Sequence, residues 1–410
     1  MGPARYSPDD IYKALPSGGA TWVHGCSGES AVLAAAPSTA GAALGAMTIT
    51  GIFIPGVNRN TYIVNNQIRV RSFFLTPELK ATGGAQVDFR PITYTEILAG
   101  LDRSDLDAIL FQVAPPDEDG ICSFGPIADF APDIWKKIPI RVAHINPKMP
   151  RVRGWPGIPF SEITAYTEHE SKLIGNPRET SDAVSDAIAS HIARFVGDGA
   201  TLETGLGKAP LAVCRALSTR RNLRMHTGLV GDGILDLIEA GALASGAAVT
   251  AGVAIGSEEL YAAVSGPQFD FQPVRVTHDV RAIGAIENFV AINSAIEVDL
   301  WGQAYAEFGP KGFMSGPGGA SDFARGAKIS GGLRIIALPS SARGVSRIVG
   351  PGAGGGPVSL SRFETDVVVT EHGAADIRGL GHDDRAKALI AVAAPEYRAE
   401  LQSRWDQQPD

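Results

Sequence analysis

Short runs of aliphatic and β-branched residues alternate with helix-forming stretches along the chain of 410 residues. Runs of about four to eight such residues, bounded by turn residues, are typical of buried strands. The expected strands are TITGIFI (48–54), AILFQV (108–113), IRVAHIN (140–146), VTAGVAIG (249–256), VAINSAIEVDL (290–300), RIIALP (334–339) and DVVVT (366–370). This alternation predicts an α/β protein with largely parallel sheets.

The clearest domain boundary lies near residue 180. The stretch SDAVSDAIASHIARFVGDGA (181–200) has apolar residues at helical spacing, with Thr180 or Ser181 as the expected cap and Gly197 as the expected stop. A chain of this length has room for two or three domains. We therefore predict an N-terminal α/β domain over 1–180 and a C-terminal α/β domain over 181–410.

Two consecutive strand-turn-helix units follow this helix, in TLETGLGKAPLAVCRAL (201–217) and RNLRMHTGLVGDGILDLIEAGAL (221–243). The second strand is expected to end near Thr227, so that Gly228 lies in the turn. In open α/β sheets, ligands bind at the carboxyl ends of the strands. Gly228 is therefore expected in the active crevice.

The composition excludes several classes of protein. A net charge of −8 argues against nonspecific binding to nucleic acid, and no apolar run reaches the length of a membrane span. The N-terminus has acidic residues where a signal peptide would be apolar, and three well-separated cysteines form no disulfide framework or zinc motif. We expect a cytoplasmic, reduced protein that binds neither membrane nor nucleic acid.

The turn GLGKAP (205–210) is the first candidate binding element. Its glycines let the backbone approach a ligand closely, and the following helix directs free N–H groups toward an anion or an oxyanion. A tight strand-to-helix turn that needs glycine for its dihedral angles is the alternative interpretation. The spacing around Lys208 is not that of a phosphate-binding P-loop.

Two further glycine-rich loops occur in the C-terminal half. SGPGGASDFARGAK (315–328) begins with a flexible glycine loop and then carries Arg325 and Lys328, which could hold phosphates. PGAGGGP (351–357) has only Arg347 as a nearby cation, so a plain loop is the better interpretation.

The histidines are scattered. His24, His226 and His372 lie next to loops, and none has a partner at metal-ligand spacing, so we predict no metal site. The chain contains no nucleophile elbow and no dinucleotide fingerprint. A lone histidine is usually structural, but His226 stays a catalytic candidate because it is expected at a strand end.

With these segments in view, the chain resembles the acetyl-CoA hydrolase/transferase family of CoA-transferases, which includes 4-hydroxybutyrate CoA-transferase. The resemblance covers about residues 70 to 400, and the first 60 residues fit more loosely. The motifs that carry it, in the order of the family, are LDAILFQVAPPDEDGICSFG (106–125), HINPKMPRVRG (144–154), GATLETGLGKAP (199–210), FVAINSAIEVDLWGQ (289–303), GPGGASDFARGA (316–327), ALPSSARGVSRIV (337–349) and VTEHGAADIRG (369–379).

The resemblance implies two similar α/β domains with the active site at their interface, a homodimer, and a CoA thioester as substrate, with no permanently bound cofactor. It also implies that CoA is contacted by the turn of Gly205, Leu206, Gly207, Lys208 and Ala209 and by the loop of Gly318 and Gly319, and that Asn293 and Glu297 line the same site. Lys328 and Arg343 are further candidates for binding CoA.

One position departs from the family pattern. The resemblance implies a glutamate directly after the His-Thr or His-Ser pair, and this carboxylate forms a mixed anhydride and then a glutamyl-CoA thioester. Here the pair His226-Thr227 is followed by Gly228, which has no nucleophile. The ordinary covalent transferase mechanism cannot run through this position.

Four explanations are compatible with the glycine. The chain could belong to a branch that hydrolyses a thioester, or cleaves a neighbouring carbon–carbon bond, without a covalent glutamate. A carboxylate could have moved in from elsewhere, with Glu203 and Glu29 of HGCSGES (24–30) as candidates. The chain could be a noncatalytic binder, or the glycine could be an engineered substitution, although Leu229 and Gly231 also differ from the transferase pattern.

The leading hypothesis is noncovalent hydrolysis of an acyl-CoA. Glu203 or Glu29 would activate water, and Gly228 would leave space for that water or for a bulky acyl group. Glu203 could also be a polar residue at a strand end, and Glu297 could orient its loop without reacting. CoA transfer through a relocated carboxylate is the rival within enzymes, and a CoA-binding protein without turnover is the rival of another class.

Overall fold

The computed structural model describes residues 2–309 and 312–408, and its contacts divide the chain into two compact units. Unit 1 contains residues 1–177 and 250–276, and unit 2 contains residues 178–249 and 277–410. The chain passes from unit 1 to unit 2 after residue 177, three residues before the predicted boundary at 180. Residues 250–276, however, belong to unit 1. A single boundary predicted from the sequence cannot include this return of the chain to unit 1, because the return is defined by long-range contacts.

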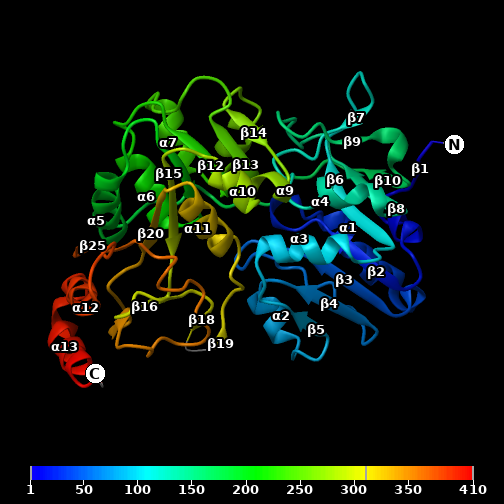
Figure 1. Ribbon diagram of the computed structural model, residues 1–410. Coiled ribbons are helices and arrows are strands. Elements are labelled where there is room, and N and C mark those ends of the chain that lie inside the picture. The colour runs from blue at the N-terminus through cyan, green and yellow to red at the C-terminus, as the bar shows by residue number, and fades with distance from the viewer. Residues whose placement is uncertain (1, 310–311, 409–410) are drawn as a thin grey trace. The chain divides into compact units, whose positions relative to one another are not determined.

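Unit 1 is built on a sheet of eight strands in the order β1-β10-β8-β6-β2-β3-β4-β5 (Figure 1). All its paired neighbours are parallel. The strands are β1 (Ala4–Arg5), β2 (Gly19–Val23), β3 (Met47–Gly51), β4 (Ile68–Ser72), β5 (Val87–Phe89), β6 (Ala108–Val113), β8 (Ile140–Ile145) and β10 (Ala165–Glu168). Every residue of β6 is buried, as expected for a central parallel strand that is covered on both faces.

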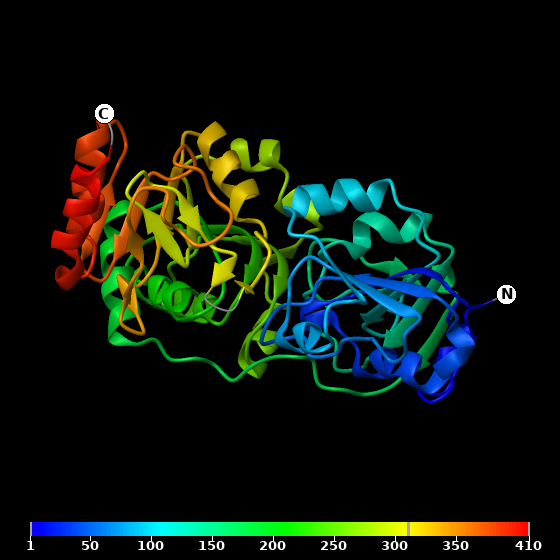
Figure 2. The same ribbon diagram turned by 90° about the horizontal axis from the view of Figure 1, so that it is seen from below.

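Short helices and small strands complete unit 1. Thr93 and Glu96 cap α3 reciprocally, which satisfies backbone N–H groups that the helix itself leaves unpaired. In Figure 2, α3 lies along one side of the strands of unit 1. The further elements of this unit are α1 (Ala31–Ala40), α2 (Pro77–Ala81), α3 (Tyr94–Asp102), α4 (Ala131–Ile134), β7 (Ile121–Cys122), β9 (Ile158–Pro159), α8 (Glu258–Ala263), β14 (Phe269–Phe271), most of β13 (Val249–Ala254) and most of α9 (Val274–Thr277).

In unit 2, neighbouring sheet strands follow the order β12-β11-β15-β20-β24-β25. The ladders are parallel except for the last pair, β24 with β25. These strands are β11 (Thr201–Thr204), β12 (Arg224–Val230), β15 (Phe289–Ser294), β20 (Leu333–Ala337), β24 (Val367–Thr370) and β25 (Gly373–Asp376). The run expected as one strand over 290–300 is in fact two, because the chain leaves the main sheet after Ser294 and enters a small sheet at Glu297.

The helices of unit 2 lie on both faces of its sheet. Figure 2 shows α10 and α11 on one side of the strands and α5 and α6 on the other. The helices are α5 (Ala183–Ile192), α6 (Lys208–Ala216), α7 (Gly233–Glu239), α10 (Val280–Gly284), α11 (Ala320–Ile329), α12 (His382–Ala391) and α13 (Arg398–Asp406), and the small strands are β16 (Glu297–Asp299), β17 (Ala304–Tyr305), β18 (Phe308–Gly309), β19 (Gly312–Phe313), β21 (Ser341–Ala342), β22 (Val345–Ser346) and β23 (Ile348–Val349).

The expected caps of α5 were wrong by a short distance. Asp182 is the residue that caps the helix, because its side chain accepts a hydrogen bond from the backbone N–H of Ser185. The helix ends at Ile192 and continues as a short 3-10 turn, so Gly197 lies beyond its stop. The predicted fold class, mixed α/β with parallel sheets, is confirmed.

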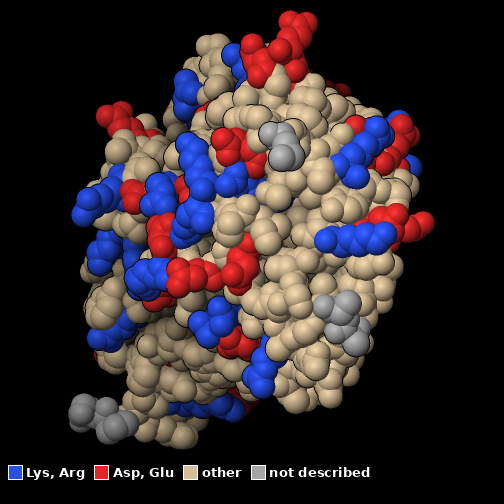
Figure 3. All heavy atoms as spheres, turned by 90° about the vertical axis from the view of Figure 1, so that its right-hand side faces the viewer, with Lys and Arg blue, Asp and Glu red and all other residues tan. Residues whose placement is uncertain are grey.

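The surface carries charges of both signs. Figure 3 shows Lys and Arg side chains interspersed with Asp and Glu on the face that it presents. Ion pairs such as Arg5 with Glu168 and Arg141 with Glu162, each at 2.7 Å, are consistent with this mixing. Within the part of the chain that the structure describes, no helix combines the length and the apolar character needed to cross a membrane.

Candidate active site

The strand that carries Gly228 is longer than expected. β12 runs from Arg224 to Val230, so Gly228 lies within a strand and not in the turn after it, which corrects the prediction that the strand ends near Thr227. The hydroxyl of Thr227 donates to the carbonyl of Thr204 on the neighbouring strand at 2.9 Å. This side-chain link continues the contact between β11 and β12 beyond their paired residues, and it fixes the strand at Gly228.

Glu203 and His226 lie on the same face of the unit 2 sheet. The parallel register pairs Leu202 with Met225, so the residues that follow them, Glu203 and His226, are neighbours across the two strands. Gly228 comes two residues after His226 and therefore faces the same side. The structure thus brings together three of the residues that the sequence singled out.

Glu203 is a buried carboxyl with one clear side-chain partner. It is 4% exposed, and the Nδ2 of Asn293 donates to its Oε2 at 2.8 Å. Burial raises the pKa of Glu203 to about 8, while the hydrogen bond from Asn293 lowers it. Asn293 is on β15, the strand on the other side of β11. Two of the predicted site residues are therefore in direct contact.

The space beside Gly228 is filled by a histidine that sequence reasoning missed. A Cβ atom at Gly228 would lie 2.7 Å from both Cε1 and Nε2 of His278. A Cβ atom at Gly319 would lie 2.6 Å from the same Nε2. Real Cβ atoms essentially never approach this closely, so the imidazole of His278 lies between two glycines that cannot carry side chains while it is there. His278 comes just before α10, and nothing in the local sequence marks it.

His226 and His278 are both held as neutral groups. Burial lowers the pKa of His278 to about 3 and also lowers the pKa of His226. The Nε2 of His226 is 3.0 Å from the carbonyl oxygen of Thr277, to which it donates, and the Nδ1 of His278 is 2.9 Å from the hydroxyl of the same threonine. Phe323 of α11 packs on His278, with ring centroids 4.9 Å apart. Both imidazoles are thereby fixed in place.

The first glycine turn is open to solvent. Gly205, Leu206, Gly207 and Lys208 are exposed, and Ala209 is half-buried. A Cβ at Gly205 or at Gly207 would meet nothing within 4 Å, but Gly207 has φ +109°, which side chains rarely adopt. The ammonium of Lys208 is 3.1 Å from the carboxylate of Asp182, the cap of α5.

The second glycine loop leads into α11. Gly318 has φ +61° and Gly319 is the residue before the first turn of the helix. Lys328 is in the last turn, roughly 12 Å further along the helix axis, so the cation and the loop are at opposite ends of α11. Arg325 pairs with Glu364 at 3.1 Å.

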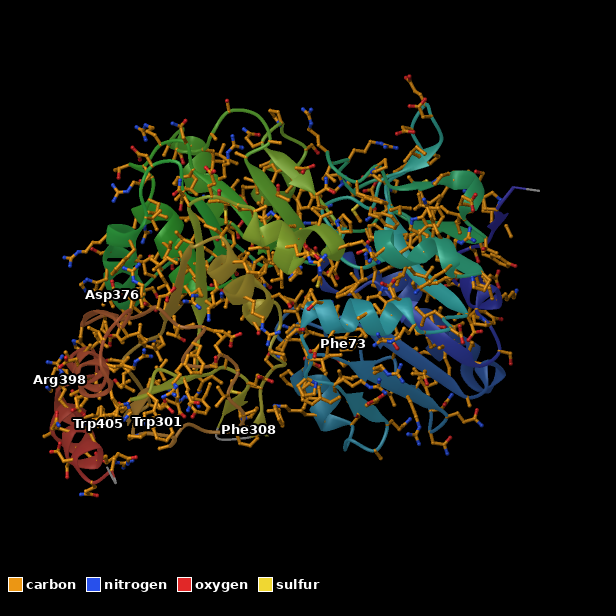
Figure 4. All side chains as sticks on the ribbon, in the orientation of Figure 1. Phe73, Trp301, Phe308, Asp376, Arg398 and Trp405 are labelled. Carbon is orange, nitrogen blue, oxygen red and sulfur yellow. The ribbon has the colours of Figure 1, made fainter. Side chains whose placement is uncertain are left out.

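The third glycine loop, at 351–357, is bound by carboxylates. Glu297 accepts from the backbone N–H of Gly355 at 2.8 Å, and Asp299 accepts from that of Gly352 at 3.1 Å. Figure 4 shows Trp301 and Phe308 in this part of unit 2. A Cβ atom at Gly354 would collide with Tyr305 and one at Gly356 with Phe308, at 2.2 and 2.3 Å, and one at Gly352 would lie a tight 3.1 Å from Trp301. Glu297 therefore orients this loop, and the loop needs glycine for packing.

Arg343 lies in a tight turn away from the main sheet. Arg343 and Gly344 connect β21 to β22, and both have positive φ, at 53° and 72°. Such values at both central residues are those of the turn that suits a two-residue hairpin. The side chain of Arg343 is exposed and forms no ion pair with the residues that the structure describes.

Glu29 belongs to unit 1, where the HGCSGES segment follows β2. Its side chain accepts from the Nδ2 of Asn60 at 2.6 Å, and burial raises its pKa to about 7. Among the described residues, no hydrogen-bond partner lies within normal distance of the other, buried carboxylate oxygen, although Asn58 is near enough to lower the pKa of the group. Cys26, three residues earlier, has φ +51°, and Asn58 donates to its carbonyl oxygen at 2.9 Å. This turn is therefore constrained by Asn58 and Asn60, which lie in the segment between β3 and β4.

The remaining candidates from the sequence have ordinary surroundings. His24 is buried in unit 1, where burial lowers its pKa to about 4, and His372 is 3.8 Å from the carboxylate of Glu371. Among residues 2–309 and 312–408, no group of three His, Cys, Asp or Glu side chains is arranged to hold a metal ion.

Comparison with known proteins places this arrangement in a class. The solved structure of RipA from Yersinia pestis matches 98% of this chain and 97% of its own with a TM-score of 0.91 and 29% identity. The 4-hydroxybutyrate CoA-transferase of Porphyromonas gingivalis matches 98% of the chain and 97% of its own with a TM-score of 0.82 and 28% identity. The chain therefore has the fold of a CoA-transferase.

Sequence comparison identifies the family. A family model described as the acetyl-CoA hydrolase/transferase C-terminal domain matches residues 256–405. The 4-hydroxybutyrate coenzyme A transferase of Clostridium kluyveri is 35% identical over 338 residues, which are 79% of this chain and 79% of that protein. The chain belongs to the acetyl-CoA hydrolase/transferase family of enzymes, and the resemblance drawn from its motifs is confirmed.

Proposed function

We propose that this enzyme hydrolyses an acyl-CoA thioester without forming a covalent bond to the substrate. The observation that carries the proposal is that strand position 228 has no side chain, while the adjacent strand supplies a buried carboxyl, Glu203, on the same face. The family description, which names hydrolases and transferases of acetyl-CoA, supports an acyl-CoA as the substrate class.

In the proposed reaction, Glu203 acts as the general base. Its carboxylate takes a proton from water while the water oxygen attacks the thioester carbonyl carbon. The resulting oxyanion is stabilised by backbone N–H groups of the glycine turn at 205–207. The oxyanion then collapses, the carbon–sulfur bond breaks, and the proton on Glu203 passes to the departing thiolate. One carboxylic acid and one CoA thiol leave the site.

The ionisation of Glu203 suits this role at mildly alkaline pH. With a pKa of about 8, the carboxyl is mostly protonated at neutral pH and becomes a base as the pH rises. A base is most effective when its pKa lies near the working pH. Glu29, whose pKa is about 7, is the alternative base.

The proposed CoA contacts are the glycine turn at 205–209, the loop at 318–319 and Asn293. The backbone carries this binding more than the lysines do, because Lys208 is paired with Asp182 and Lys328 is at the far end of α11. We also propose that the enzyme is dimeric, as the family resemblance implies, and cytoplasmic, as its three scattered cysteines indicate.

CoA transfer is the second candidate function. A relative that is 35% identical over most of the chain is named a CoA transferase, which favours it. In that case Glu203 itself would attack the acyl carbon and later carry CoA as a thioester. Attack by Glu203 needs the same deprotonated carboxylate as base catalysis, so its pKa of about 8 predicts the same rise of activity with pH for both functions.

One experiment separates these functions. The protein is incubated with a panel of acyl-CoAs, with and without free carboxylic acids, while free thiol and new thioesters are measured. Thiol release without an acceptor supports hydrolysis. New thioester that requires an acceptor supports transfer and contradicts the proposal, as does acyl-CoA binding without turnover.

A further inference from the structure

We infer that His278 is a positioning residue whose ring occupies the space that a side chain at position 228 would need. It thereby prevents covalent catalysis from that position. The inference rests on the proposed function, because it explains how the chain stays limited to noncovalent chemistry. In this role, His278 excludes side chains at Gly228 and Gly319 and does not itself react.

The steric conflict at both glycines comes mainly from the ring of His278. Neither Gly228 nor Gly319 has positive φ, so the backbone of each accepts an ordinary residue. At Gly228 the two closest atoms to an added Cβ are both on His278, and the next is the ring of Phe323 at an acceptable 3.7 Å. At Gly319, His278 is again closest, with Phe323 at 3.0 Å. Both positions are therefore closed mainly by one imidazole.

His278 cannot move aside easily. It is 2% exposed, its Nδ1 contacts the hydroxyl of Thr277, and Phe323 packs on its ring. Asp279, the next residue, caps α10 by accepting from the N–H groups of Arg281 and Ala282. Backbone and ring are both fixed, so a side chain at 228 could enter only if the imidazole were removed.

This arrangement predicts the outcome of the substitution Gly228→Glu. The single substitution does not restore a nucleophile, because the new side chain collides with His278. Combined with His278→Ala, the new carboxylate has space. It can then attack the thioester carbonyl carbon and release CoA thiolate, which attacks the mixed anhydride at the glutamyl carbon. The acyl carboxylate leaves, and an enzyme-bound CoA thioester remains.

A thermal cycle tests the packing without any assay of activity. Gly228→Ala and Gly319→Ala are each expected to lower Tm by roughly 5 °C in the natural protein. In a His278→Ala background, Gly228→Ala is expected to leave Tm unchanged or to raise it, and Gly319→Ala, which still meets Phe323 at 3.0 Å, is expected to lose less than in the natural protein. Gly205→Ala is the matched control, because a Cβ there meets nothing, and it should shift Tm by no more than about 1 °C. Equal losses with and without His278 would overturn the inference.

A trapping experiment tests the chemical consequence. Each protein is incubated with acyl-CoA, treated with borohydride, which reduces an enzyme thioester, and weighed by mass spectrometry. The double variant Gly228→Glu with His278→Ala should show the modified mass, and Gly228→Glu alone should not. A trapped adduct in the single variant, or none in a folded double variant that binds acyl-CoA, contradicts the inference. If the double variant does not fold, the thermal cycle still decides.

The proposed hydrolysis and the proposed role of His278 can be disproved independently of each other. A protein that shows the thermal coupling but releases no thiol from any acyl-CoA loses the proposed hydrolysis and keeps the role of His278. A protein that hydrolyses acyl-CoA without thermal coupling keeps the proposed function and loses this role.

Discussion

Each of the two units holds a buried carboxyl that an asparagine binds, but their backbones differ. Glu29 of unit 1 follows a constrained turn and directly precedes Ser30, the cap of α1, while Glu203 of unit 2 lies within a parallel strand. Asn60 donates to the first at 2.6 Å and Asn293 to the second at 2.8 Å. Burial raises the pKa of Glu29 to about 7 and that of Glu203 to about 8.

Hydrogen bonds offset part of the effect of burial at both carboxyls. Asn60 and Asn58 lower the pKa of Glu29, and Asn293 together with a backbone hydrogen bond at Ile292 lowers the pKa of Glu203. Glu203 still holds its proton to a higher pH than Glu29 does. The comparison therefore favours Glu203 as a base that works near pH 8 and Glu29 as a group that is already half-ionised at pH 7.

The largest expected effect separates the two carboxyls by activity. Glu203→Gln should lower kcat/KM for acyl-CoA hydrolysis by about 100-fold or more, because a general base typically contributes that much. Glu29→Gln should cost less, and Glu297→Gln, which alters a contact with the 351–357 loop and an ion pair with Arg347, is the matched control. Steady-state thiol release measures all three. If Glu29→Gln is the more damaging change, the base has been assigned to the wrong unit.

The pH profile should follow the carboxyl that acts. The base must be deprotonated, so kcat/KM should rise with pH and level off above the pKa of about 8 given by Glu203. Glu29 would give the same sign with a midpoint near 7. Initial rates from pH 5.5 to about 9.5 distinguish them when the profile is repeated with Glu29→Gln, which should leave the midpoint near 8. Activity that falls over this range would exclude a carboxylate base.

Removing the asparagine should move the midpoint of that profile. Asn293→Ala takes a hydrogen bond from the charged form of Glu203, so its pKa should rise and the midpoint should shift by about one unit to higher pH. Asn60→Ala is the counterpart in unit 1 and should leave the midpoint unchanged. The same rate measurements check both variants, and an equal shift in both would remove the distinction between the units.

The smallest expected effect concerns the turns. Cys26 of unit 1 has φ +51°, in a region that non-glycine residues can enter, whereas Gly207 of unit 2 has φ +109°, where glycine is strongly preferred. Gly207→Ala should therefore lower the free energy of unfolding by about 1–2 kcal/mol. Gly205→Ala should change it by less than about 0.5 kcal/mol, since its space is open and its φ is not positive. Denaturant unfolding measures both. Equal losses would show that the side chain, and not the dihedral angle, is the cause.

The strands and the fold class followed from the sequence because buried parallel strands have a local signature. The stretch AILFQV was predicted at 108–113, and β6 spans the same residues. The family was also readable, since several ordered motifs carried it. The absence of a carboxylate at Gly228 needed only the order of His226, Thr227 and Gly228 along the chain.

The tertiary structure decided what surrounds Gly228. His278 is 50 residues further along the chain, and only the packing of α10 and α11 on the sheet brings its ring between Gly228 and Gly319. The partners of Glu203 and Lys208 likewise come from other elements, Asn293 on β15 and the cap of α5. The sequence by itself determined that a nucleophile is missing, because that is a property of one position. What fills its place depends on contacts between distant residues, which local patterns do not encode.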